Sequence, residues 1–257
     1  MKILRCLVIA WAVMCVGVFC LSGCSSEPDY VGKCVVVFLD RSGSVKSDAN
    51  IYADAFGIIR ESLRSKDRIV IANITANSSR DFNAFLDIEI PDPLDGVNRL
   101  LETDADYQKK TEDSKTEINA ALSEVEGEID RFLATPSNSP LTAIMEATHI
   151  SQQIFAADER RAVLVLLSDM VEESESLNMT RNSFKGVPAD TALARMEEIG
   201  LVPDLAGVEV FIAGAMPGGN KDAVKVSEFW QLYFDAAGAH LGNGHYARHL
   251  SSFVDNQ

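Results

Sequence analysis

Runs of apolar residues constrain the fold of this chain more than any other feature. The first run, residues 34–39, reads CVVVFL and contains β-branched and aromatic side chains without polar alternation. Such a run is typical of a strand that is buried on both faces, as strands in parallel sheets are. Further strand-like runs lie at 69–74, 162–167 and 208–213, and helical periodicity occupies the stretches between them. This alternation predicts one doubly wound α/β domain with a mostly parallel sheet.

Local patterns predict the remaining elements. Residues 85–90 alternate apolar and acidic side chains, which indicates an edge strand with one solvated face, closed by Pro91 and Pro93. We expect this strand to be the one antiparallel member of the sheet. The tail at 245–253 fits either a last strand or a partial helix. Helices are expected at about 48–64, 94–101, 105–133, 141–156, 189–200 and 222–239.

The sequence leaves the roles of two polar segments open. The first part of the long predicted helix, about 105–117, is almost wholly polar, so it is either a solvated helix face or a partner surface. An acidic loop at 170–186 follows the run at 162–167 and could likewise form a second interface.

The first residues have the features of a secretory signal. Lys2 and Arg5 precede an apolar run, residues 6–21, that is short for a membrane span. The segment LSGC, ending at Cys24, resembles the lipobox of bacterial lipoproteins. The resemblance implies removal of 1–23 and acylation of Cys24, with 24–32 as the lipidated residue and its tether. The alternative is an ordinary signal peptide that happens to contain this cysteine.

This resemblance also implies a location. The protein would sit in the cell envelope, anchored to a membrane by its lipid. Ser25, which follows the lipidated position, implies the outer membrane facing the periplasm in a Gram-negative host, or alternatively the cell surface.

Charge and cysteine content exclude several classes of protein. The chain has 38 acidic and 23 basic residues, a net charge of −15, and loss of Lys2 and Arg5 with the signal would make it −17. An acidic chain of this kind is unsuited to binding nucleic acid or anionic lipid headgroups. Of the five cysteines, processing would leave Cys24 and Cys34. With Cys24 acylated and Cys34 in the core, no internal disulfide can form.

Oxygen-bearing side chains follow the predicted strands or stand at a helix start in three places. Asp40, Ser42 and Ser44 come after the first run, Ser139 lies in the loop before a predicted helix, and Asp169 follows the run at 162–167. Ligands of open α/β sheets bind at the carboxyl ends of the strands. Hydroxyl and carboxylate oxygens suit a hard divalent cation such as Mg²⁺.

These positions resemble the metal-ion-dependent adhesion site of the von Willebrand factor A domain, also called the integrin I-like domain. That family has an Asp-x-Ser-x-Ser turn after its first strand, a hydroxyl on a second loop and an Asp after its fourth strand. The resemblance covers roughly residues 32–253 and implies a Rossmann-like von Willebrand factor A fold over 33–257, with a helical insertion at about 94–134. It implies that Mg²⁺, or another hard divalent cation such as Mn²⁺ or Ca²⁺, is held by Asp40, Ser42, Ser44, Ser139 and Asp169.

The chain departs from the family pattern at several positions. Ser139 replaces the commoner Thr, and Met170 stands where Gly is usual after Asp169. Three acids, Glu172, Glu173 and Glu175, lie just beyond. If they approach the ion, they would repel an acidic partner or occupy the open coordination site themselves.

The resemblance implies a non-catalytic, lipid-anchored module for adhesion or scaffolding, in which a partner protein's carboxylate completes the metal site. In the family, ligand binding can shift the last helix. One alternative is a solute-binding lipoprotein of a transport system. Another is a hydrolase that uses Asp40, although Ser42 stands where phosphatases of the haloacid dehalogenase type have a second Asp. A zinc site at His240, His245 and His249 lacks a supporting Cys or carboxylate pair.

Overall fold

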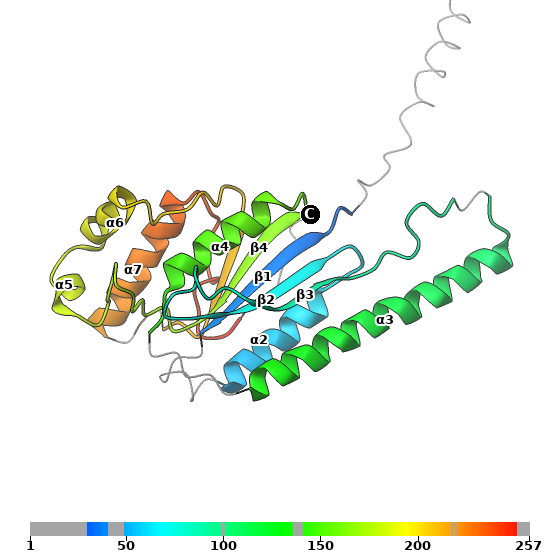
Figure 1. The fold of residues 1–257 in the computed structure, drawn as a ribbon, viewed down its shortest axis with the longest axis horizontal. Helices are drawn as coiled ribbons and strands as arrows, with labels where there is room; N and C mark the ends of the chain where they lie inside the picture. Colours follow the sequence, from blue (N-terminus) through cyan, green and yellow to red (C-terminus); the bar gives the residue numbers. More distant parts are fainter. Residues whose placement is uncertain are drawn as a thin grey trace, which may run out of the picture. The chain divides into compact units, whose positions relative to one another are not determined.

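The computed structural model describes residues 30–40, 49–98, 101–135, 141–216, 218 and 220–250. Its centre is a five-stranded sheet (Figure 1). The strands are β1 (Lys33–Asp40), β2 (Arg68–Ile74), β3 (Ala84–Glu89), β4 (Arg161–Leu167) and β5 (Glu209–Ala213). Their order is β3-β2-β1-β4-β5, and β3 alone runs antiparallel to its neighbour. The predicted mostly parallel sheet with one antiparallel edge strand is confirmed.

Helices cover both faces of this sheet. On one face lie α2 (Ala49–Ser62) and α3 (Asp104–Ala134), and on the other lie α4 (Ile144–Ala156), α5 (Asn182–Lys185), α6 (Ala189–Glu198) and α7 (Lys221–Ala236) (Figure 1). Alternate side chains of β1 enter the two resulting cores, and residues 34–39 are all at most 1% exposed. Burial also raises the pKa of the Cys34 thiol to about 12, with a smaller contribution from Asp158, so this thiol is unreactive.

The chain divides into two compact units, and all five strands of the sheet belong to the second. Residues 32–257 cluster as one compact unit, and residues 1–31 form another. Of the latter unit the structure describes Tyr30 and Val31, so the predicted signal, Cys24 and most of the tether lie outside the described residues.

The expected helix at 94–101 is wrong over its described part. Residues 93–96 form a turn, after which the Val97 amide donates to Leu94 O at 3.0 Å. Gly96 adopts a left-handed backbone, φ +71°, which an α-helix cannot contain. Leu101 is 82% exposed and has no core to bury it. A helix here would have gained no packing energy.

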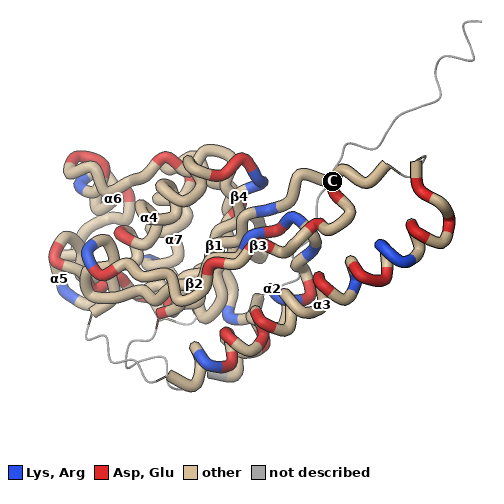
Figure 2. Tube along the Cα trace, turned by 45° about the vertical axis from the view of Figure 1, so that its right-hand side comes forward, with Lys and Arg blue, Asp and Glu red and all other residues tan. Residues whose placement is uncertain are grey.

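The long helix α3 begins after this turn. The Thr103 side chain accepts a hydrogen bond from the Asp106 amide at 3.2 Å and so caps its first turn. Its second half packs Val125, Ile129 and Phe132 into the core, whereas its first half is mostly exposed, as predicted. Charges of both signs run along it (Figure 2). Within the described ranges, no helix combines the length and the apolar character that crossing a membrane requires.

The last described segment lies along the outer edge of β5. His240 forms a parallel bridge with Glu209, and Tyr246 forms one with Ile212. The His245 ring stacks on Phe211 with centroids 4.0 Å apart. The described part of the tail, up to residue 250, therefore extends the sheet by isolated bridges and is not helical.

A buried ion pair stabilises the amino end of the parallel strands. Lys33 Nζ lies 3.2 Å from Asp67 Oδ2, and both side chains are at most 1% exposed. Asp67 also accepts hydrogen bonds from the backbone amides of Lys33, at 2.9 Å, and Arg64, at 2.8 Å. These bonds compensate for the loss of water around the carboxylate.

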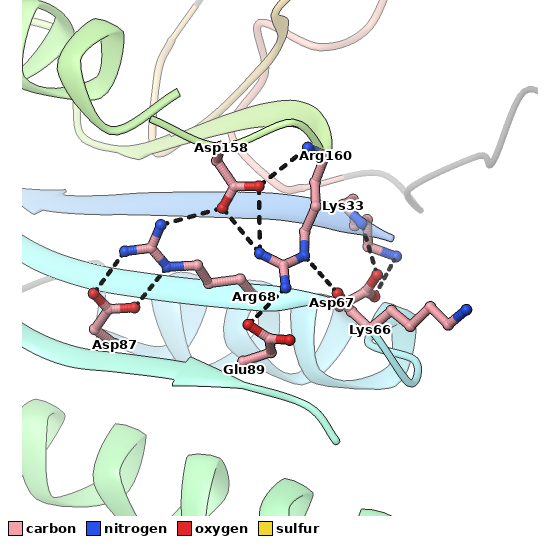
Figure 3. A network of polar contacts seen from close by, with 8 residues as sticks. All are labelled: Lys33, Lys66, Asp67, Arg68, Asp87, Glu89, Asp158 and Arg160. Atoms are coloured by element: carbon pink, nitrogen blue, oxygen red, sulfur yellow. Dashed lines mark hydrogen bonds and ion pairs between the residues drawn. The ribbon is translucent and has the colours of Figure 1, made fainter. Parts of the chain in front are cut away.

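A second set of charges at this end links β2 and β3 to the loop before β4 (Figure 3). Asp158, at 4% exposure, contacts both Arg68 and Arg160 at 3.1 Å. Arg68 continues to Asp87 on β3, and Arg160 continues to Glu89. The amino end of the sheet is therefore closed by mutually neutralising charges.

We expect Asp67→Asn to lower the free energy of unfolding by about 3–5 kcal/mol, because it leaves the Lys33 ammonium buried without a counter-charge. Urea denaturation measures this loss. The added substitution Lys33→Met should recover part of it. As a control, Glu126→Gln removes the exposed ion pair with Arg60 and should cost at most about 1 kcal/mol. Equal losses for Asp67→Asn and Glu126→Gln would contradict this account.

Candidate functional site

The carboxyl end of the central strand carries a buried acid. Asp40 is the last residue of β1, and its side chain is 1% exposed. It lies beside the end of β4, because Leu39 pairs with Leu167. The Ser168 hydroxyl, fully buried, donates a hydrogen bond to Asp40 Oδ2 at 3.0 Å and accepts one from the Met170 amide at 2.9 Å. The two strand ends are therefore joined through a neutral hydroxyl.

Asp169 follows at the end of β4. Its Oδ1 accepts a hydrogen bond from the Val171 amide at 3.0 Å, and its side chain is partly exposed. Burial raises the pKa of Tyr246, and the negative charge of Asp169 raises it further, which places this carboxylate near the tyrosine. The predicted positions Asp40 and Asp169 thus lie at the ends of adjacent strands, at one edge of the sheet.

The other predicted metal ligands, Ser42, Ser44 and Ser139, lie outside the described residues. Among the described residues, no three His, Cys, Asp or Glu side chains come together as a metal-binding group. The predicted site needs only two carboxylates, and the groups described at this edge include Asp40, Asp169 and the Ser168 hydroxyl. These oxygens are the donors that a hard cation such as Mg²⁺ prefers, so their chemistry fits one.

Met170 adopts an unusual backbone conformation next to Asp169. Its φ is +65°, a region that favours glycine, and its side chain is fully buried in the core. Left-handed strain costs about 1–3 kcal/mol, and burying a methionine compensates by a similar amount. The Trp230 ring donates a hydrogen bond from Nε1 to Met170 O at 2.7 Å, which ties α7 to the loop carrying Asp169.

Close packing holds the third strand of this edge in place. Gly214 follows β5 with φ +98°, and a Cβ there would lie 2.9 Å from Ser168 O and 3.0 Å from the Tyr52 hydroxyl. The edge therefore requires glycine at this position.

Glu172 does not extend toward solvent. Its side chain is fully buried, and its Oε2 accepts hydrogen bonds from the amides of Ile144 at 2.7 Å and Met145 at 3.2 Å, at the start of α4. Oε1 has no hydrogen-bond partner among the described residues. Burial raises the pKa of Glu172 to about 8. The hydrogen bonds from the Met145 and Ile144 amides lower this pKa and offset the effect of burial only in part.

The neighbouring acids differ from Glu172. The backbone of Glu173 pairs with Thr142, at 2.8 Å from Glu173 N to Thr142 O, and forms a bridge to Asn178, whereas Glu175 is exposed. The three acids lie close together in the sequence, which gives no sign of the role of Glu172 in capping α4. Its position three residues after Asp169, facing a helix start, gave no local pattern that would reveal this.

The histidines form no metal site in the described part of the chain. His240 and His245 have ring centroids 6.2 Å apart, and His245 Nδ1 lies 3.1 Å from Val210 O. His245 and His249 do not share a helical face, because residues 240–250 are not helical.

Comparisons with known proteins give only distant likenesses. No family model and no curated protein matches the chain. Similar solved structures include proximal thread matrix protein 1 from the mussel byssus, with 12% identity and a TM-score of 0.43. The open form of the pilus adhesin SpaC from Lactobacillus rhamnosus GG has 10% identity and a TM-score of 0.45. A von Willebrand factor type A structure from Catenulispora acidiphila has 16% identity and a TM-score of 0.34.

These alignments cover 87%, 85% and 80% of this chain, but only 43%, 28% and 43% of the respective chains. This chain thus spans less than half the length of each. The likenesses assign no function, and the fold class rests on the observed sheet.

We expect Glu172→Gln to change how stability depends on pH. The folded-state pKa of about 8 lies above the ordinary value of 4.5, so the folded protein retains a proton that the unfolded chain releases. Stability of the unmodified chain should therefore fall as pH rises from 5 to 8, by up to about 1.4 kcal/mol per pH unit. Glutamine cannot ionise and removes this contribution.

Urea midpoints at several pH values measure the difference between the two proteins. The exposed Glu175→Gln serves as the control and should follow the unmodified chain across the same range. Parallel pH profiles for the unmodified chain and Glu172→Gln would show that burial does not raise the pKa as described.

Proposed function

We propose that this chain is a non-catalytic binding module, which captures a protein partner at the carboxyl edge of its sheet through a divalent cation. The observation that carries the proposal is the position of Asp40 and Asp169. Asp40 ends β1, Asp169 lies two residues beyond the end of the adjacent β4, and the buried Asp40 accepts a hydrogen bond from the Ser168 hydroxyl. The resemblance of the surrounding sequence to a metal-ion-dependent adhesion site supports the same conclusion.

The residues that would hold the cation are Asp40, Ser42, Ser44, Ser139 and Asp169. When bound, Mg²⁺ would supply an electrophilic position that a carboxylate of the partner can fill. The acidic residues of the chain itself determine how much negative charge lies at this edge. Glu172 is engaged with the amides of Ile144 and Met145, which supports a site whose remaining position is left to an outside acid.

The alternatives receive less support. A solute-binding lipoprotein normally closes two lobes around its ligand, whereas the described residues form one sheet within one compact unit. A hydrolase with Asp40 as nucleophile needs that carboxylate to reach a substrate. Asp40 is 1% exposed and is hydrogen-bonded to Ser168, an arrangement that suits a fixed ligand better than an attacking group.

Metal binding tests the proposal. We expect the purified chain to bind Mn²⁺, followed by its paramagnetic signal, in competition with Mg²⁺. Asp40→Asn and Asp169→Asn should each weaken binding at least tenfold, since each removes one of two negative ligands. Asp130→Asn, on the exposed face of α3, is the matched control. Circular dichroism should show that the variants stay folded. Undiminished Mn²⁺ binding by both folded site variants would refute the metal site.

We further propose that Cys24 is acylated and anchors the module in the cell envelope. The lipobox-like segment before Cys24 supports this. Cells expressing the chain with a radiolabelled fatty acid should label it, and Cys24→Ser should abolish both the label and its recovery in the membrane fraction. Cys34→Ser is the matched control and should keep the label. Equal labelling of Cys24→Ser and the unmodified chain would rule out this anchor.

A further inference from the structure

A pocket of about 420 Å³ lies between the loop after β4 and helix α6. Its volume falls within the range of about 300–1,000 Å³ that is usual for ligand sites. The apolar part of its lining includes Leu177, Ala192 and Met196, which are at most 9% exposed, and Leu141, which is 37% exposed. Neither Asp40 nor Asp169 lines this pocket.

Two arginines distinguish this pocket. Arg181, just before α5, and Arg195, in the last turn of α6, both line it and are both exposed. Within the described residues, neither guanidinium forms an ion pair or a side-chain hydrogen bond. Other arginines do so: Arg60, Arg68 and Arg160 each contact a carboxylate. In a chain with 38 acidic and 23 basic residues, unpaired arginines sharing one pocket indicate a place for an external anion.

The polar groups of the lining agree with this charge. Ser174, Ser176, Ser183 and Asn178 add neutral hydrogen-bonding groups, and Glu175 is the one acid among the lining residues described. The pocket beside α7 differs. It measures about 510 Å³, and its described lining contains Glu228 and Asp235 but no Lys or Arg. The two arginines therefore distinguish the 420 Å³ pocket from the 510 Å³ pocket.

We propose that this pocket binds an acidic peptide segment of a protein partner, with a carboxylate on the guanidinium groups and an apolar side chain against Leu177, Ala192 and Met196. Arginine matches a carboxylate with paired N–H donors, and the apolar lining gives the neighbouring side chain a surface to bury. A free inorganic anion would use only the arginines. The apolar lining therefore favours a peptide over a small anion.

Nuclear magnetic resonance titration of the full chain with a capped glutamate-leucine-glutamate peptide tests this pocket. We expect shifts in the amides of residues 174–181 and 192–196, with affinity falling about tenfold or more in Arg181→Gln and in Arg195→Gln. Arg80→Gln, an exposed arginine outside the pocket, is the matched control and should bind as the unmodified chain does. Binding should weaken from 50 to 500 mM NaCl, because both guanidiniums are exposed.

Two further peptides separate the two parts of the ligand. Replacing both glutamates by glutamine should abolish binding, and replacing leucine by glycine should weaken it. The proposal is overturned if no peptide binds, if both arginine variants bind as tightly as the unmodified chain, or if inorganic phosphate binds while the peptides do not. The chain is first freed of metal by passage over a chelating resin and is titrated in chelator-free buffer, so the outcome is independent of the cation proposed at Asp40.

Discussion

A sheet buried on both faces is the constraint on which the rest of this structure depends. Helices cover both sides of β1 and β4, and a polar side chain in the middle of either strand would lose its water without compensation. Charged groups are therefore confined to the strand ends. At the amino end they neutralise one another, through Lys33 with Asp67 and through the arginines around Asp158. At the carboxyl end, Asp40 accepts a hydrogen bond from the Ser168 hydroxyl, and Asp169 accepts one from the Val171 amide.

The loop that follows β4 is held from three directions. Glu172 caps the start of α4, the backbone of Glu173 pairs with Thr142, and Met170 O accepts a hydrogen bond from Trp230 of α7. These contacts fix the position of Asp169, because it immediately precedes the restrained segment. A site on such a loop is preorganised and needs little reordering when a ligand binds. The hydrogen bond from Trp230 also connects the loop that carries Asp169 to α7.

Much of the fold could be predicted from the sequence, because burial on both faces leaves a local pattern. The run at 34–39 and the alternation at 85–90 identify a central strand and an edge strand by composition alone. The helix expected at 94–101 was wrong because Gly96 adopts a left-handed backbone and Leu101 finds no core. Spacing alone cannot show whether an apolar residue has a surface to pack against.

The site was predictable only in part. Asp40 follows an apolar run directly and Asp169 follows another after Ser168, so their place at the sheet edge could be inferred from the chain. The hydrogen bond from Ser168 to Asp40, which joins residues 128 positions apart, depends on which strands pair. The role of Glu172 at α4 and the shared pocket of Arg181 and Arg195 depend likewise on tertiary packing. No local pattern encodes such contacts.

The central claim is that the carboxyl edge of this sheet holds a divalent cation. Anomalous X-ray scattering from crystals grown with Mn²⁺ tests it most directly, since it locates the ion without assumptions about the ligands. The account predicts one strong peak at the ends of β1 and β4, within about 2–2.6 Å of oxygens from the chain. A map with no peak at this edge, or with the manganese bound elsewhere on the acidic surface, would contradict it.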